Sequence, residues 1–224
     1  LMKHILKILK KYSFYIILIF ILLFMQANCD LTLPEYTSDI VNIGIQQSGI
    51  ESPVPEVIKE EEYNKLLLFM NSENKEKVND SYVLITKDDR EYLDEYPLLN
   101  EENLYILKDD ASDLRSIITL PMIMVYNISQ ENFDFSSLDF QIPEGMSIYD
   151  ALKMMDEQQH DEFINKMSEK YSSDTVSLLE QTAIVYLKDE YTKIGLDVEG
   201  MQIGYIAITG LKMLGLALLS MALT

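Results

Sequence analysis

The side chains best suited to acid–base or metal chemistry gather around one histidine. Asp156, Glu157, Asp161 and Glu162 flank His160 in the sequence, and an imidazole with carboxylates is a usual ligand set for divalent cations. Two interpretations follow from this spacing: a divalent-cation site, or a solvated junction between two helices. We expect the solvated junction, because acidic side chains are abundant throughout this part of the chain, and we predict no metal ligand.

No other residue pattern predicts a reaction. The eight glycines occur singly, and none belongs to a G-x-x-x-x-G-K-[ST] phosphate loop or a G-x-S-x-G nucleophile turn. Acidic pairs such as Glu101–Glu102 and Asp109–Asp110 do not indicate a glycosidase dyad, because residues 51–200 hold 34 acids and adjacent pairs arise by chance. We therefore predict no catalytic residue, no cofactor-binding residue and no enzymatic activity in this chain.

The single cysteine, Cys29, follows a long apolar run and cannot form an internal disulfide. Lysines, an apolar run and then a cysteine also describe a lipoprotein signal. Cleavage of such a signal needs a small residue just before the cysteine, whereas this chain has Asn28 there and Gln26 two positions earlier. We expect Cys29 to be a small apolar residue on a membrane helix instead, and we keep the anchored lipoprotein as an alternative.

The first apolar run has the length of a membrane-spanning helix. Tyr12 to Cys29 are 18 residues without a charge, and a helix of this length spans about 27 Å, close to the hydrocarbon thickness of a bilayer. The helix is expected to continue past the membrane towards Asn42, with Pro34 as its kink. Four lysines precede the run, so the N-terminus is expected inside the cell and the following segment outside: Lys3, Lys7, Lys10 and Lys11.

The charge of the chain is concentrated in its middle. The formal charge is −19 overall, and residues 51–200 carry 13 basic and 34 acidic side chains, a local charge of −21. A surface of this sign repels nucleic acid, so that class of partner is excluded, and it attracts cations. We expect residues 51–200 to form one acidic extracellular domain that has cationic peptides as its candidate partners.

The second apolar run lies at the other end. Ile203 to Thr224 contain one charge, Lys212. We expect a second, truncated membrane helix over 201–224, with 1–50 holding the cytoplasmic N-terminus and the first helix, so that the chain is the N-terminal fragment of a longer protein. For Lys212 two positions are open, in a translocation path or at the outer interface, and we expect the interface.

Within 51–200 the patterns are mostly helical. A helix is expected over 56–70 after the prolines at 53 and 55, another over 73–80 capped by Ser72, and a short one over 88–96. The β-branched run 82–86 is expected to pair with 104–107. The apolar run within 113–129 is too short to cross a membrane and should form the buried spine of the domain.

The second half of this domain shows apolar side chains at helical spacing. Ser147 is expected to cap a helix, Gly195 to end the last one and Gly200 to act as a hinge. The apolar stripes of the three helices are Ile148, Ala151, Leu152 and Met155; Phe163, Ile164 and Met167; and Val176, Leu179, Ala183, Ile184, Leu187 and Tyr191. The predicted fold is mainly α, with two antiparallel transmembrane helices flanking a mostly helical extracellular domain that has at most a small β hairpin.

The stretch after the first apolar run resembles a known family. Pro34 is followed by Asp39-Ile40-Val41-Asn42-x-Gly44-Ile45, which is similar to the end of the first transmembrane helix of ABC-type exporters. The segments 46–50 and 205–221 are similar to a clostridial-type branch with a large extracellular domain between its first two membrane helices. On this resemblance the family-motif positions are Pro34, Asp39, Asn42 and Gly44.

The resemblance implies a multi-pass bacterial plasma-membrane permease of multidrug, peptide or lipid type. Such a parent protein has six membrane helices and an ATPase domain that uses ATP and Mg2+, and it pairs with a second half-transporter, identical or different. This chain lacks the later helices and the ATPase domain, so no cofactor and no ATP-site residue is predicted in it. A receptor or sensor kinase with an outside domain between two membrane helices remains the alternative.

Overall fold

The computed structural model describes residues 12–108, 112–130, 142–143, 145–171 and 176–223. The chain divides into two compact units, one made of residues 1–49 and 199–224, the other of residues 50–198. The lysines expected to set the topology lie outside the described residues.

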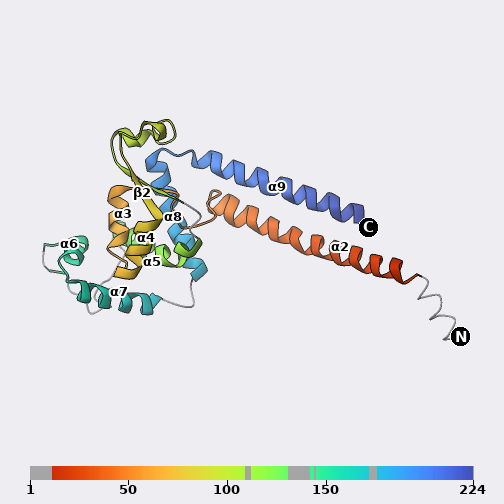
Figure 1. The fold of residues 1–224 in the computed structure, drawn as a ribbon, viewed down its shortest axis with the longest axis horizontal. Coiled ribbons are helices and arrows are strands. Elements are labelled where there is room, and N and C mark those ends of the chain that lie inside the picture. Colours follow the sequence, from red (N-terminus) through yellow and green to blue (C-terminus); the bar gives the residue numbers. More distant parts are fainter. Residues whose placement is uncertain (1–11, 109–111, 131–141, 144, 172–175, 224) are drawn as a thin grey trace. The chain divides into compact units, whose positions relative to one another are not determined.

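The first unit consists of two long helices that lie side by side and run in opposite directions (Figure 1). Helix α2 spans Ser13–Asp39 and continues without a break as a π-helix, η1, over Ile40–Gln46. Helix α9 spans Val198–Leu223. The expected continuation of the first helix towards Asn42 is confirmed, and Pro34 lies inside α2. A proline cannot donate a backbone hydrogen bond, so this helix tolerates one missing bond near its exposed end.

Both helices have the length and apolar composition to cross a membrane, over Ser13–Gln46 and Val198–Leu223. Their side chains are largely exposed: 6% of the most apolar window is buried in the first and 11% in the second. A core helix of a water-soluble domain passes the same length test but hides its apolar side chains. The exposure of these two therefore favours an apolar surrounding.

The second unit contains a three-stranded antiparallel sheet with the order β1-β3-β2. Strand β2, Tyr82–Ile85, pairs with β3, Leu104–Leu107, so that Tyr82 faces Leu107 and Ile85 faces Leu104. This pairing was predicted and is confirmed. A third strand, β1, spans Val57–Lys59 and pairs with the other edge of β3.

Strand β1 corrects the expected helix over 56–70, which begins only at Glu60. The acidic run there is typical of a helix start, but the residues before it make bonds to distant segments instead. The backbone of Glu56 accepts from Leu107 at 2.9 Å and donates to the Tyr191 hydroxyl at 2.8 Å. Tertiary pairing thus overrides a local helical preference.

The remaining elements of this unit are short helices around the sheet. They are α3 Glu60–Leu67, α4 Ser72–Ser81, η2 Arg90–Tyr92, η3 Pro97–Asn100, η4 Ser112–Leu114, α5 Arg115–Ser129, α6 Ile148–Lys153, α7 Glu157–Tyr171 and α8 Val176–Ile194. Helix α5 packs on α8, α3 packs on α5, and α8 packs on β1. The helices therefore join the sheet in one core.

Three expected helix boundaries differ from the structure. The cap of α4 is Asn71, whose side chain accepts from the Asn74 backbone at 3.0 Å, and Ser72 is the first helical residue. The expected helix over 88–96 is a single 3-10 turn, η2. The expected hinge at Gly200 lies inside α9. The cap of α4 is shifted by one residue, as is usual for helix ends, whereas the type of element expected over 88–96 was wrong.

Two expected boundaries are confirmed. Ser147 accepts from the Asp150 backbone at 3.1 Å and caps α6. Gly195 follows α8 with φ of +91°, a left-handed conformation that glycine adopts without strain.

The core of this unit follows the predicted spine. Helix α5 is buried over most of 118–125, and Met122 and Met124 are fully enclosed. The apolar stripes of α6, α7 and α8 are buried with it: Ile148, Ala151, Leu152, Phe163, Ile164, Met167, Ala183, Ile184, Leu187 and Tyr191. The side chains of Val176 and Leu179 lie outside the described residues, and Met155 lies at the edge of a groove. The predicted fold class is confirmed: mainly helical, with a small sheet and long apolar helices at both ends.

Candidate functional site

The family-motif residues lie on α2 and η1, which pack along α9. Three contacts define the register of the two helices: Asp30 with Ser220, Thr37 with Met213 and Gly44 with Ile206. The two residue numbers sum to 250 in each pair, so the helices are antiparallel and residue i of α2 lies level with residue 250 − i of α9.

The helix contact, defined by these three pairs, contains one of the four motif residues. Gly44 is buried, whereas Pro34 and Asn42 are exposed and Asp39 is half-buried. The Asn42 side chain donates to the Ser38 hydroxyl at 3.0 Å, within its own helix. The motif therefore supplies one contact residue, and its polar members remain on the outer face.

Gly44 permits close approach of the two backbones. A β-carbon at this position would lie 2.7 Å from Ile206 Cγ1, which is closer than van der Waals contact allows. Cys29, Thr209 and Ser220 are also buried in this unit. Small residues of this kind let membrane helices pack closely. In lipid the hydrophobic effect does not drive helix association, so close packing contributes to it instead.

A second glycine, which sequence reasoning missed, closes the end of this contact. Gly49 has φ of +82°, and a β-carbon there would lie 2.7 Å from the Met201 carbonyl oxygen. Ser48 before it also has a positive φ, of 55°. The Ser48-Gly49 dipeptide after a helical run is a turn signal, and it could have indicated this position.

In this register Lys212 of α9 lies level with Ser38 of α2. Its side chain is exposed. Asp30, the first charged residue after the uncharged run of α2, lies eight residues before Ser38, or about 12 Å at the helical rise. The exposure and this level agree with the interface interpretation of Lys212.

His160 lies in the core and corrects the expected solvated junction. It is 5% exposed, and Nε2 lies 2.9 Å from the Leu68 carbonyl oxygen. Burial lowers the pKa of this imidazole, because the charged form loses hydration. His160 falls on the same stripe of α7 as Phe163, Ile164 and Met167, and that spacing is the signal that could have indicated its burial.

The four acids around His160 have structural partners. Asp156 accepts from the Gln159 backbone at 2.9 Å, and Glu162 pairs with Lys166 at 2.9 Å. Glu157 accepts from the Ser72 hydroxyl at 2.9 Å, and Asp161 accepts from the Ser72 backbone at 3.0 Å. No group of three or more possible ligands that could hold a metal ion occurs in the described part of the chain.

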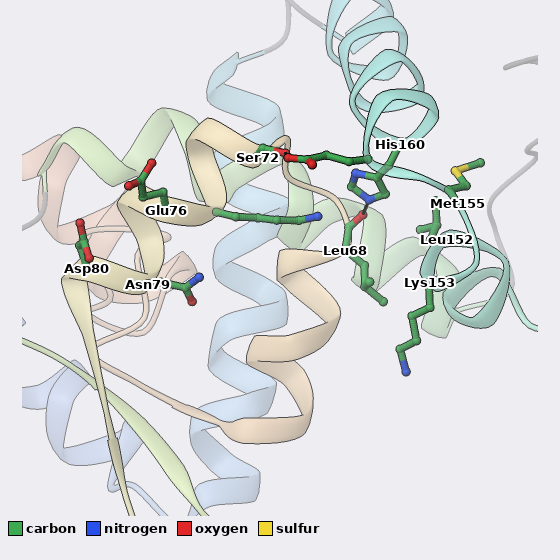
Figure 2. A pocket seen from close by; sticks show the side chains of 11 residues that line it. Leu68, Ser72, Glu76, Asn79, Asp80, Leu152, Lys153, Met155 and His160 are labelled. Carbon is green, nitrogen blue, oxygen red and sulfur yellow. Dashed lines mark hydrogen bonds between the residues drawn. The ribbon is translucent and has the colours of Figure 1, made fainter.

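Next to His160 lies an open groove between α4 and the α6–α7 segment, with a volume of about 700 Å³ (Figure 2). We call it the α4–α7 groove; its lining is Leu68, Ser72, Lys75, Glu76, Asn79, Asp80, Leu152, Lys153, Met155, Glu157 and His160. Figure 2 shows Glu76, Asn79 and Asp80 on one wall and Leu152, Lys153 and Met155 on the other. The groove therefore has a polar wall opposite one that combines the half-buried Met155 with the exposed Lys153.

A further buried acid, Glu190, lies on α8 near Lys59 of β1. Glu190 is 2% exposed; Lys193 donates to its Oε1 at 2.7 Å, and Lys59 Nζ lies 3.9 Å from its Oε2. Among the described residues, Oε2 accepts no hydrogen bond. Burial raises the pKa of this carboxyl, and the two lysines and the neighbouring Glu62 modify the shift.

No protein-family model, no curated protein and no solved structure matches this chain.

Proposed function

We propose that this chain is the N-terminal part of the permease of an ATP-driven exporter of the ABC type, of the multidrug, peptide or lipid class, with residues 51–200 on the outer side of a bacterial plasma membrane. The observation that carries the proposal is the position of Gly44, the glycine of the Asp39–Ile45 motif, in the contact between α2 and α9. On this proposal the motif holds the first two membrane helices together, and the helices contribute to a translocation path.

The lengths and exposures of the two helices support a membrane-embedded role. Each has exposed apolar side chains over most of its surface, among them Phe20 at 68% and Leu211 at 69%. A stable helix with such a surface needs lipid or other membrane helices around it. The second half-transporter and the lipid bilayer are the proposed partners, and ATP with Mg2+ is proposed for the ATPase domain of the parent protein.

Cysteine labelling in intact cells tests the topology. In a Cys29→Ser background, Glu73→Cys places a thiol on an exposed part of α4, and Ser13→Cys places one at the start of α2. A reagent that does not cross membranes should label position 73 and not position 13. Labelling of position 13 alone would reverse the topology and contradict the exporter proposal.

The sensor-kinase alternative has the same topology, so a second experiment is needed to separate the two. Membranes that contain the full reading frame are incubated with ATP labelled on its γ-phosphate. An exporter releases the label as inorganic phosphate, whereas a sensor kinase keeps it covalently bound to the protein. Covalent label without phosphate release would reject the exporter and favour the sensor.

The acidic domain has a proposed role in attracting cationic peptides to the outer mouth of the permease. This role is supported by the charge of −21 over residues 51–200, since attraction to exposed charges raises the local concentration of a cationic partner. The attraction should fall as the Debye length shortens from about 10 Å at 0.1 M salt to about 3 Å at 1 M. Binding of a basic peptide that does not weaken over this range would contradict the role.

A further inference from the structure

The α4–α7 groove contains a lysine, Lys75, that forms no ion pair with the described residues. Lys75 is half-buried, and no carboxylate among the described residues lies within 4.0 Å of its ammonium. Burial lowers the pKa of Lys75, while Asp161 and Glu157 act in the opposite direction. Both of these acids accept hydrogen bonds from Ser72, which holds their carboxylates at α4.

An anionic group in the groove would stabilise this lysine. A half-buried ammonium has lost part of its hydration, and an ion pair there is less screened than one at the surface. Phosphate or another multiply charged anion fits poorly, because Glu76, Asp80 and Glu157 also line the groove. A single carboxylate on a molecule that also carries a positive charge fits the mixture of signs.

The rest of the groove fits such a molecule. Glu76 and Asp80 are one helical turn apart on α4, both exposed, and neither takes part in an ion pair within the described part of the chain. Opposite them, the half-buried Met155 offers an apolar surface (Figure 2). The volume of about 700 Å³ lies within the range of about 300–1,000 Å³ that is usual for small-ligand sites.

We propose that the α4–α7 groove binds short peptides with free ends. The C-terminal carboxylate pairs with Lys75, an apolar C-terminal side chain packs on Met155, and the N-terminal ammonium faces Glu76 and Asp80. This assignment goes beyond the exporter proposal and does not depend on it, because every residue of the groove lies in the unit of residues 50–198.

Calorimetry on the full chain in detergent micelles tests the site with the tripeptide Gly-Gly-Leu. Lys75→Met should weaken binding at least tenfold, since it keeps the apolar stem and removes the charge. Lys77→Met is the matched control: Lys77 is on the same helix, pairs with Glu73 at 2.6 Å and does not line this groove. The tripeptide with an amidated C-terminus should bind as weakly to the natural chain as Gly-Gly-Leu binds to Lys75→Met.

Protection from acetylation gives a second readout on the unmodified chain. Gly-Gly-Leu should slow acetylation of Lys75 at least threefold and leave Lys77 unchanged, as measured by mass spectrometry of the digested protein. Equal losses of binding in both lysine variants would indicate general charge attraction and overturn the proposal. An amidated tripeptide that binds as well as the free one would also overturn it, as would absent heat and absent protection in a chain that circular dichroism shows to be folded.

Discussion

The helix pair, formed by α2 with η1 and α9, and the domain of residues 50–198 differ in how each is packed. The 50–198 domain buries large side chains, among them Tyr63, Tyr191 and Met122 at 2% exposure or less. The helix pair keeps its large side chains outward and places Gly44 and Cys29 in its interior. The hydrophobic effect favours the buried side chains of the 50–198 domain, because burial removes apolar area from water. Lipid is as apolar as leucine, so the hydrophobic effect does not hold the helix pair together, and close backbone approach contributes instead.

The largest expected difference concerns the same residue type in the two regions. Leu187 in α8 is fully buried and Leu211 in α9 is 69% exposed. Leu187→Ala should lower the free energy of unfolding of the 50–198 domain by about 2–5 kcal/mol, the usual cost of a cavity in a packed core. Leu211→Ala should change it by less than about 0.5 kcal/mol. Urea unfolding of the chain in detergent, followed by tyrosine fluorescence, measures both.

Equal destabilisation by Leu187→Ala and Leu211→Ala would contradict the expected difference between the two regions. That result would mean that the exposed face of α9 is packed against protein under the conditions of the measurement.

Two glycines test whether the helix pair depends on close backbone approach. Gly49→Ala forces a left-handed backbone that costs about 1–2 kcal/mol for an L-residue, and its β-carbon meets the Met201 carbonyl. Gly204→Ala is the control, because nothing lies within 4 Å of a β-carbon there. Cysteines at Thr37 and Met213, which lie in contact, report the helix pairing in a Cys29→Ser background. Their disulfide yield should fall severalfold with Gly49→Ala and remain unchanged with Gly204→Ala. A fall in both variants would show that the face of α9 at Gly204 is packed against another part of the protein.

Acid should lower the stability of the 50–198 domain through His160. Its pKa is lower in the folded state than in the unfolded chain, so the folded state binds fewer protons. The stability it contributes is present above the unfolded value of about 6.5 and is lost as the pH falls through the lower folded value. His160→Asn removes this titration, so its stability should fall less than that of the natural chain between pH 7 and pH 5.

Glu190 provides a variant with the opposite sign. Its pKa is raised on folding, so its contribution is present at acid pH and is lost as the pH rises through the folded value. Glu190→Gln should therefore make the loss of stability on acidification steeper. Urea unfolding at a series of pH values measures the slopes, and a change of the same sign in both variants would contradict the assigned burial of one of them.

The smallest effect is expected at Lys212. The exposed lysine lies level with Ser38, beyond the uncharged run of α2. On the exporter proposal, Lys212→Met should therefore leave expression and transport nearly unchanged. A large loss of transport at normal expression would place Lys212 in the translocation path instead.

The sequence predicted those parts of the fold that depend on local pattern. The β-branched run from Tyr82 and the apolar spine of α5 were identified because their spacing determines the face that they bury. Strand β1 was missed because its partners, such as Ile106 for Val57, lie far away in the chain. Pairing at that distance leaves no mark in the neighbouring residues.

The candidate sites followed the same division. Gly44 was named from a motif, but its contact with Ile206 required the register of two distant helices. The acids around His160 suggested solvent, whereas the structure uses two of them to hold Ser72. Side chains of like charge are informative only when their partners are known, and those partners lie on other elements.

The register of the helix pair has a consequence for how it fits a bilayer. The uncharged run of α2, Tyr12 to Cys29, is centred about 16 residues, or about 24 Å, from the level of the centre of the Ile203–Thr224 run in α9. A hydrocarbon layer of about 30 Å cannot cover both runs fully. At any depth, either α9 has leucines outside the lipid or α2 has carboxylates such as Asp30 inside it. The helix pair therefore has a hydrophobic mismatch with a bilayer. We expect the bilayer to become thinner around it or the two helices to tilt.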